Sequence, residues 1–164
     1  MNIVTVAHTT PAFTRKSEGD VIELMDGRIL AIYMEFSGDG SDLAPTRIVG
    51  QESDDGGRTW RGHRVIAVTT PGDMNVYSPN LIRSQDGGIL LVFMRQKSAV
   101  PLCTTQHVWK SLDEGRTFVP FAEFAAGRDY SLCNGVIKRL SSGRLLLSRR
   151  PRPWLGRAPH PVLP

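Results

Sequence analysis

Apolar runs alternate with short glycine-containing turns three times along the chain. The segments IELMDGRILAIYM (22–34), IRSQDGGILLVFM (82–94) and IKRLSSGRLLL (137–147) share this pattern. In each segment an Asp-Gly or Ser-Gly turn joins two apolar, β-rich runs, which is typical of a β-hairpin. The runs ILAIY and ILLVF are almost continuously apolar, as expected for strands that are buried on both faces. The pattern therefore predicts three hairpins.

The hairpins belong to a longer repeat. Their turn glycines, Gly27, Gly87 and Gly143, are 60 and 56 residues apart. After each of the first two hairpins come a polar loop (35–45 and 96–104), a third strand (TRIVGQES and TQHVWKS) and a fourth strand (WRGHRVIAV and FVPFAEF). Four antiparallel strands repeated at roughly 40–60 residues indicate β-propeller blades. The chain is therefore predicted to be all-β, with blade one at about 15–68, blade two at about 76–124 and the start of blade three at about 130–148.

One octapeptide lies between the third and fourth predicted strands of both full repeats. SDDGGRTW (53–60) returns as SLDEGRTF (111–118), and both copies read Ser-x-Asp-x-Gly-x-Thr followed by an aromatic residue. The glycine can supply a positive φ, and the aspartate can accept hydrogen bonds from the amides of its own turn. The adjacent Asp54 and Asp55 leave a cation-binding loop as an alternative, although the distal glutamate of an EF-hand is missing. A structural turn is the favoured interpretation.

This octapeptide resembles the Asp box, the BNR repeat of the sialidase (neuraminidase) superfamily. The matching positions are Ser53, Asp55, Gly57, Thr59 and Trp60 in the first copy, and Ser111, Asp113, Gly115, Thr117 and Phe118 in the second. The resemblance covers roughly residues 15–147 and implies a six-bladed propeller, of which about two and a half blades are present. The chain thus looks like an N-terminal fragment. In the family the Asp boxes lie away from the active site.

Strand parity predicts which loops lie together. Within a blade, the Asp-Gly turns and the Asp boxes share one end, here called the Asp-box end. The second-to-third loops and the links between blades share the other, here called the loop end, which collects residues 12–20, 35–46, 69–79, 96–105 and 125–134. Its candidate polar residues are Arg15, Lys16, Glu18, Asp20, Glu35, Asp39, Asp42, Arg47, Asp73, Asn75, Tyr77, Arg128 and Asp129. Loops on a rigid scaffold are the usual location of functional residues.

The resemblance implies an exo-glycosidase that hydrolyses terminal sialic acid or a related acidic sugar from glycoconjugates. Sialidases bind the sugar carboxylate through arginines and use an acid together with a tyrosine nucleophile. The family's first arginine lies in an Arg-Ile-Pro motif just before the first strand of blade one. This chain has TRKSEGDVIEL there instead, in which Arg15 is the candidate carboxylate ligand. Asp42, in GDGSDLAPTRI, is the acid/base candidate, with Asp39 as the fallback. An ordinary surface arginine and a solvated loop carboxylate are the alternatives. The family's nucleophile cannot be assigned to any residue of this chain.

Charge and composition narrow the range of partners. The net charge is +4, but residues 149–164 carry four arginines and no acid, so the rest of the chain has 16 basic and 16 acidic residues. A nucleic-acid partner is therefore not expected, and no apolar stretch suggests a membrane span. No secretory signal is visible, which makes a cytoplasmic location the default expectation. The Pro/Arg-rich tail is expected to be non-native or disordered, with a natural linker as the alternative.

The remaining expectations concern cofactors and a competing function. Cys103 and Cys133 lack CxxC spacing and are interpreted as incidental thiols, with a disulfide or metal pair as the alternative. Neither a metal nor a cofactor is expected, and the expected partner is a sialoside or other acidic glycan. Asp boxes also occur in propellers without catalytic activity. A non-catalytic propeller that binds glycans or protein is therefore the alternative function, and a small independent β domain has little support.

Overall fold

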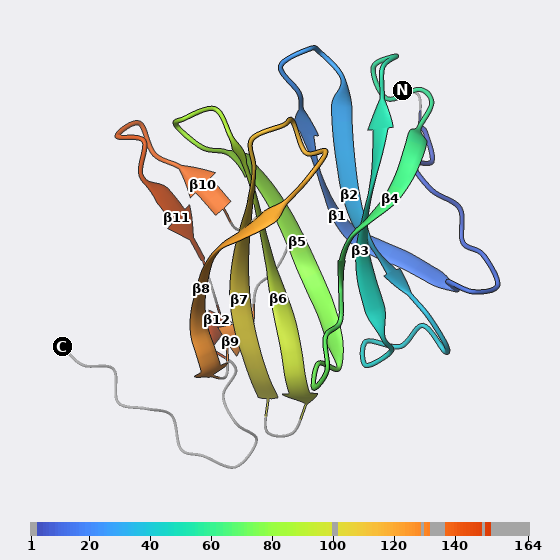
Figure 1. Ribbon diagram of the computed structural model, residues 1–164. Coiled ribbons are helices and arrows are strands. Elements are labelled where there is room, and N and C mark those ends of the chain that lie inside the picture. Colours follow the sequence, from blue (N-terminus) through green and yellow to red (C-terminus); the bar gives the residue numbers. More distant parts are fainter. Residues whose placement is uncertain (1–2, 100–101, 129, 132–136, 149, 152–164) are drawn as a thin grey trace.

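The structure, a computed structural model of the chain, is built from antiparallel strands (Figure 1). It describes residues 3–99, 102–128, 130–131, 137–148 and 150–151. The first four-stranded sheet, blade one, has the order β1 (Arg15–Glu23), β2 (Ile29–Phe36), β3 (Thr46–Ser53), β4 (Arg61–Val68). The second, blade two, has the order β5 (Asn75–Arg83), β6 (Ile89–Ala99), β7 (Leu102–Ser111), β8 (Val119–Arg128). The predicted all-β fold is confirmed.

Two short strand pairs follow blade two. β10 (Ile137–Arg139) and β11 (Leu145–Leu147) form the predicted third hairpin. β9 (Tyr130–Ser131) pairs with β12 (Arg150–Pro151), so two residues of the tail that was expected to be disordered form a strand. The other tail residues, and Cys133, lie outside the described residues, while Cys103 carries a free thiol.

The hydrophobic pattern located most strands and misplaced one loop. The third strand of blade one spans the predicted TRIVGQES segment, whereas β1 begins at Arg15, before the predicted hairpin. The prediction of a polar loop at 96–104 is wrong, because strands occupy most of this segment. β6 continues to Ala99 and β7 begins at Leu102, with Ala99 and Leu102 paired. The polar side chains of Gln96 and Thr104 are buried in this extension, so a pattern based on apolar residues does not reveal it.

The main core lies between the two blades. Leu30 and Ile32 of β2 meet Leu91 and Phe93 of β6, and Val76 of β5 belongs to the same cluster. These side chains alternate with a second set that faces the opposite side of each sheet, as the period of a strand requires. On blade two that opposite side is also apolar. Its Val92 and Met94 pack against Ile137 and Leu147 of the third hairpin.

The two blades are copies of one backbone design. Arg15 pairs with Phe36 in blade one, and Asn75 pairs with Gln96 in blade two, at an offset of 60 residues. Both inner strands contain a β-bulge with a non-glycine residue at positive φ, Glu18 in β1 (48°) and Ser78 in β5 (53°).

The ends of the sheets are arranged as strand parity predicts. Figure 1 shows the Asp-Gly turns and both Asp boxes at one end, and the β2–β3 loop with the link between the blades at the other. Among the described residues, no helix is long and apolar enough to cross a membrane.

Candidate functional site

The first Asp box is a closed hydrogen-bonded turn. Asp55 Oδ1 accepts bonds from the amides of Arg58 and Thr59 at 2.8 and 2.9 Å, and Asp55 Oδ2 accepts one from Thr59 Oγ1 at 2.6 Å. Ser53 Oγ donates to the same carboxylate at 2.8 Å and accepts from the Gly57 amide at 2.8 Å. The bonds from Thr59, with that from Ser53, lower the pKa of Asp55 well below its usual range. The carboxylate is thus engaged by its own turn.

The second Asp box repeats the bonds made by its serine, threonine and glycine, whereas the Arg116 amide donates to the Asp113 main-chain carbonyl at 3.4 Å instead of to the carboxylate. Asp113 accepts from the Thr117 amide at 2.9 Å and from Thr117 Oγ1 at 2.6 Å, and Ser111 Oγ donates to it at 2.7 Å. Burial alone would raise the pKa of Asp113, but the bonds from Thr117 and Ser111 outweigh it and lower the pKa to about 2. Both boxes therefore have the structural-turn geometry expected from the sequence.

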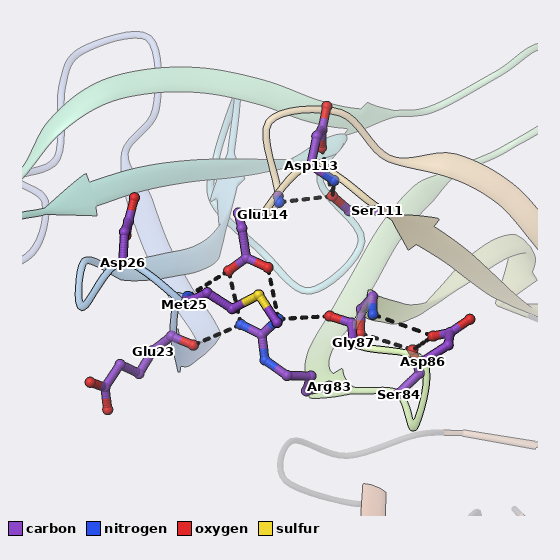
Figure 2. Close-up of polar contacts among 12 residues, drawn as sticks. Glu23, Met25, Asp26, Arg83, Ser84, Asp86, Gly87, Ser111, Asp113 and Glu114 are labelled. Carbon is purple, nitrogen blue, oxygen red and sulfur yellow. Dashed lines mark hydrogen bonds and ion pairs between the residues drawn. The ribbon is translucent and has the colours of Figure 1, made fainter.

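One position of the second box has an additional role. Glu114 has a positive φ of 59°, like its counterpart Gly56 (71°) in the first box. Its carboxylate accepts bonds from Arg83 at 2.8 and 3.0 Å and from the Met25 amide at 2.8 Å (Figure 2). Met25 belongs to the first hairpin turn of blade one, so Glu114 joins the two blades. A left-handed glutamate could not be expected from residue type, although the glycine at the corresponding position 56 is consistent with a positive φ there.

The second box also packs directly against blade one. Arg64 donates to the carbonyl of Gly115 at 2.7 Å, and a Cβ at Gly115 would lie 2.5 Å from Leu30 Cδ2. Phe118 packs against the inter-blade core. Trp60 instead closes its own turn by donating from Nε1 to the Gly57 carbonyl at 3.2 Å.

At the loop end, the structure brings together the two residues predicted to act on substrate. Arg15 Nη1 lies 2.6 Å from Asp42 Oδ1 and donates to the Gly40 carbonyl at 3.3 Å. The Arg15 guanidinium stacks 4.2 Å above the ring of Phe36, which fixes its plane. Arg15 is 36% exposed and Asp42 is 85% exposed, so both charges face solvent. The two form an accessible pair of opposite charges at the end of blade one.

The fallback residue, Asp39, is placed differently. Its Oδ1 accepts a bond from the Ser41 amide at 3.0 Å, and the bonds from Ser41 lower its pKa. Asp39 lies in the same loop as Asp42 but makes no contact with Arg15 within the described part of the chain. Asp42 is therefore the better placed of the two.

Blade two holds the backbone of the Asp42 loop. Asn75 Nδ2, at the start of β5, donates to the main-chain carbonyl of Asp42 at 3.0 Å. Beside it, the Val76 amide donates to Thr46 Oγ1 at 2.8 Å, and Thr46 Oγ1 donates in turn to the Val76 carbonyl. Asn75 was among the candidate residues of the loop end, but its contact with Asp42 could not be read from the sequence.

A buried carboxylate, Glu35, lies on the face of blade one opposite to Phe36. Glu35 is 1% exposed and contacts Lys16 Nζ at 2.8 Å, Arg47 at 2.7 Å and His63 Nε2 at 3.1 Å. Burial alone would raise the pKa of Glu35, but the bonds from Lys16, Arg47 and His63 outweigh burial and lower it. Because Glu35 engages the side chains of Lys16, Arg47 and His63, this cluster stabilises the sheet.

The link between the blades contains a second buried ion pair. Asp73 is fully buried and contacts Arg95 at 2.5 Å and Lys97 at 2.9 Å. Burial alone would raise the pKa of Asp73, but the bonds from Lys97, Thr70 and Arg95 lower it well below its usual range. Of the other loop-end candidates, the Arg128 side chain and Asp129 lie outside the described residues.

Comparisons with known proteins support the fold. No known protein family and no curated protein sequence matches the chain. The chain is structurally similar to a crystal structure of a protein of unknown function from Dyadobacter fermentans, with 20% identity, a TM-score of 0.66, and coverage of 88% of this chain and 46% of that one. It is also similar to the Hadza microbial sialidase Hz136, with 19% identity, a TM-score of 0.53, and coverage of 68% and 25%. The chain therefore spans less than half the length of either structure, and it has a sialidase-like fold.

Proposed function

We propose that the loop end of blade one binds the carboxylate of an acidic sugar, and that the protein to which these blades belong is an exo-glycosidase acting on terminal sialic acid or a related sugar. The observation that carries this proposal is the exposed Arg15–Asp42 pair at 2.6 Å. It joins a carboxylate-binding group and an acid in one accessible place. The sialidase-like fold supports the same assignment.

Arg15 is suited to bind a carboxylate. A guanidinium has five N–H donors, and within the described residues only Nη1 of Arg15 is engaged, by Asp42 and the Gly40 carbonyl. Nε and Nη2 are therefore available to form the paired, charge-assisted bonds that arginine makes with a carboxylate. Stacking on Phe36 holds the guanidinium plane without occupying these donors.

Asp42 is suited to transfer a proton. A substrate carboxylate that approaches Arg15 competes with Asp42 for the same positive charge. When this competition releases Asp42 from Arg15, its carboxyl group can serve as the acid that protonates the departing glycosidic oxygen in glycoside hydrolysis.

A second candidate function is a non-catalytic propeller that binds acidic glycans. Tyr33 favours it, since its hydroxyl is buried, accepts a bond from Gln51 at 2.6 Å and is unavailable to substrate. Burial also raises the pKa of Tyr33, which makes it a poor nucleophile. Tyr33 therefore does not supply the nucleophile that an exo-glycosidase requires.

Turnover of an aryl sialoside and of a natural sialoside, by a protein that carries this chain together with its remaining blades, distinguishes the two functions. We expect Arg15→Lys to raise KM, because an ammonium cannot form the paired bonds of a guanidinium. We expect Asp42→Asn to lower kcat by about 10²–10⁴-fold on the natural sialoside, and less on the aryl sialoside, whose leaving group needs little protonation. Asp39→Asn, in the same loop, is the matched control and should retain activity.

The outcomes separate the alternatives. Loss of kcat in Asp39→Asn but not in Asp42→Asn would move the acid to Asp39. Binding without any turnover would support the non-catalytic propeller. Turnover that neither Arg15→Lys nor Asp42→Asn affects would exclude this site.

A further inference from the structure

The Asp42 loop is held by a side chain from the neighbouring blade. Asn75 is 2% exposed, and its Nδ2 lies 3.0 Å from the main-chain carbonyl oxygen of Asp42, 33 residues earlier in the chain. This bond acts on the backbone of Asp42 and leaves its carboxylate free to face solvent. The main chain of Asp42 is therefore fixed from blade two, while its carboxylate meets Arg15 of blade one.

The bond from Asn75 is poorly explained by stability alone. Asn75 Oδ1 is buried and has no hydrogen-bond partner in the described part of the chain. An unpaired buried acceptor is unfavourable, so an apolar residue of similar size would suit the packing at least as well. The opposite amide orientation would place an oxygen against the Asp42 carbonyl, so the orientation that donates to Asp42 is the better one. The position thus retains a polar group whose one bond is to the Asp42 backbone.

A neighbouring contact shows that the two blades are already joined at this level. Thr46 Oγ1 bonds to both the amide and the carbonyl of Val76, directly beside Asn75. Ala44, which is buried, packs with Met34 and Phe36 in the same region. These contacts bring the end of the β2–β3 loop against β5. They do not touch Asp42 directly. The loop's own turn, closed by the Ala44 amide bond to the Ser41 carbonyl at 3.0 Å, shapes the backbone around Asp42, and Asn75 is the side chain of blade two that bonds to it.

We infer that Asn75 is a positioning residue, which places Asp42 at the distance from Arg15 that the site requires. The inference rests on the proposed function in one respect, that Asp42 and Arg15 act together on substrate. Its consequence is that the site of blade one is completed by blade two. Asn75 occupies in blade two the position that Arg15 occupies in blade one, so the repeat itself brings these two residues to the same end.

The test measures the Arg15–Asp42 contact without any ligand. In the 164-residue chain, the ¹³C resonance of the Asp42 carboxyl should shift when Arg15 is changed to Lys. We expect this response to be lost in the background of Asn75→Leu, which removes the donor. Thr46→Val is the matched control, because it removes a buried side-chain bond at the same contact between blades without touching Asp42, and it should preserve the response.

Further variants keep the result interpretable. Asn75→Asp retains the shape of the side chain but replaces the donor with an acceptor, and it should also abolish the response. Dispersed indole signals of Trp60 and Trp109 report that a variant is folded. The inference is overturned if the wild-type chain shows no response to Arg15→Lys, if either folded Asn75 variant keeps it, or if Thr46→Val loses it equally.

This readout is independent of the sugar. If the resonance behaves as expected but no acidic sugar binds, the positioning role stands and the proposed function fails. If an acidic sugar binds at Arg15 while the Asn75 variants keep the response, the proposed function stands and the positioning role fails.

Discussion

Blade one and blade two share a backbone design but differ in the residues placed on it. At an offset of 60 residues, the exposed Arg15 corresponds to the buried Asn75, and the buried Glu35 corresponds to the buried Arg95. Glu35 is neutralised by cations of its own blade, whereas Arg95 donates to the Val68 carbonyl and to Asp73 in the link from blade one. The repeat thus sets the positions of the strands in both blades, and the residues that differ between the copies determine how the blades pack together.

The Asp boxes likewise combine positions that are shared between the two blades with a position that differs between them. Their shared residues make the same bonds in both blades. The variable position carries Gly56 in the first box and Glu114 in the second, and only Glu114 reaches the neighbouring blade through Arg83 and Met25. A match to the Asp-box pattern therefore identifies the turn, while the residues between the matching positions identify the contact.

The largest effect on stability is expected from the buried charges that differ between the blades. Glu35→Ala leaves Lys16 and Arg47 without their shared carboxylate and should lower the free energy of unfolding by about 3–4 kcal/mol. Arg95→Met, the corresponding change in blade two, should also destabilise the chain, because it weakens the neutralisation of the buried Asp73. Urea unfolding measures both. If Glu35→Ala has an effect below about 1 kcal/mol, which is typical of exposed pairs, Glu35 is not buried as described.

A smaller difference in stability is expected between alanine substitutions at the glycines of the two Asp boxes. Gly115→Ala should lower the free energy of unfolding by about 2–3 kcal/mol, because it adds a contact with the buried Leu30 to the strain of a left-handed alanine. Gly57→Ala has similar backbone strain, but its Cβ would meet nothing closer than 3.6 Å, so about 1–2 kcal/mol is expected. Parallel denaturation curves measure the difference. Equal losses of stability would show that Gly115 is not packed more closely against its neighbours than Gly57.

A comparable or smaller loss is expected when the shared aspartates are removed. Asp113→Ala leaves the amide and hydroxyl of Thr117 without their acceptor and should cost about 1–3 kcal/mol, toward the lower end because the turn is partly exposed. Asp55→Ala should also destabilise the chain and lower its melting temperature. Neither change should alter the binding of an acidic sugar, since both residues lie at the Asp-box end. Loss of binding at unchanged melting temperature would place these residues in the site.

The ionised carboxylate of Asp113 is expected to stabilise the folded chain, and the pH dependence of unfolding tests this. Its pKa is about 2 in the folded chain against a reference value of 3.8, so the folded state favours the ionised form. The resulting stability is present above pH 3.8 and is lost as the pH falls from there toward 2. Unfolding measured across this range should therefore show a smaller pH dependence in Asp113→Asn than in the wild type.

Most strands and tight turns of the two blades could be predicted from the sequence, for physical reasons that differ from one element to the next. The tight turns at Gly27 and Gly87 and the apolar strands beside them have strong local signals, and strand parity then places Arg15 and Asp42 at one end. The ends of β6 and β7 that meet at Ala99 and Leu102 could not be predicted, because Gln96 and Thr104 are polar yet buried. Such burial depends on which sheet packs next, which a local pattern does not contain.

The contacts of the site were less predictable than its location. That Asn75 bonds to Asp42, or that Glu114 bonds to Arg83, depends on how one blade docks against another. A repeat offset indicates which positions correspond, but side-chain partners between blades depend on the angle and spacing of the sheets. The left-handed conformation of Glu114 also has no sequence signal of its own, since glutamate rarely adopts it.

The most direct test of the central claim is a chemical-shift titration of the ¹⁵N-labelled chain with N-acetylneuraminic acid, with its methyl ester as the uncharged control. We expect shifts at the loop end of blade one, around Arg15 and Asp42, with little change at either Asp box. We also expect the methyl ester to bind the chain, and N-acetylneuraminic acid to bind the Arg15→Lys variant, at least about 10-fold more weakly, because each change removes a charge-assisted pair. Equal binding of the ester, or shifts centred on the Asp-box end, would show that Arg15 does not bind the sugar carboxylate.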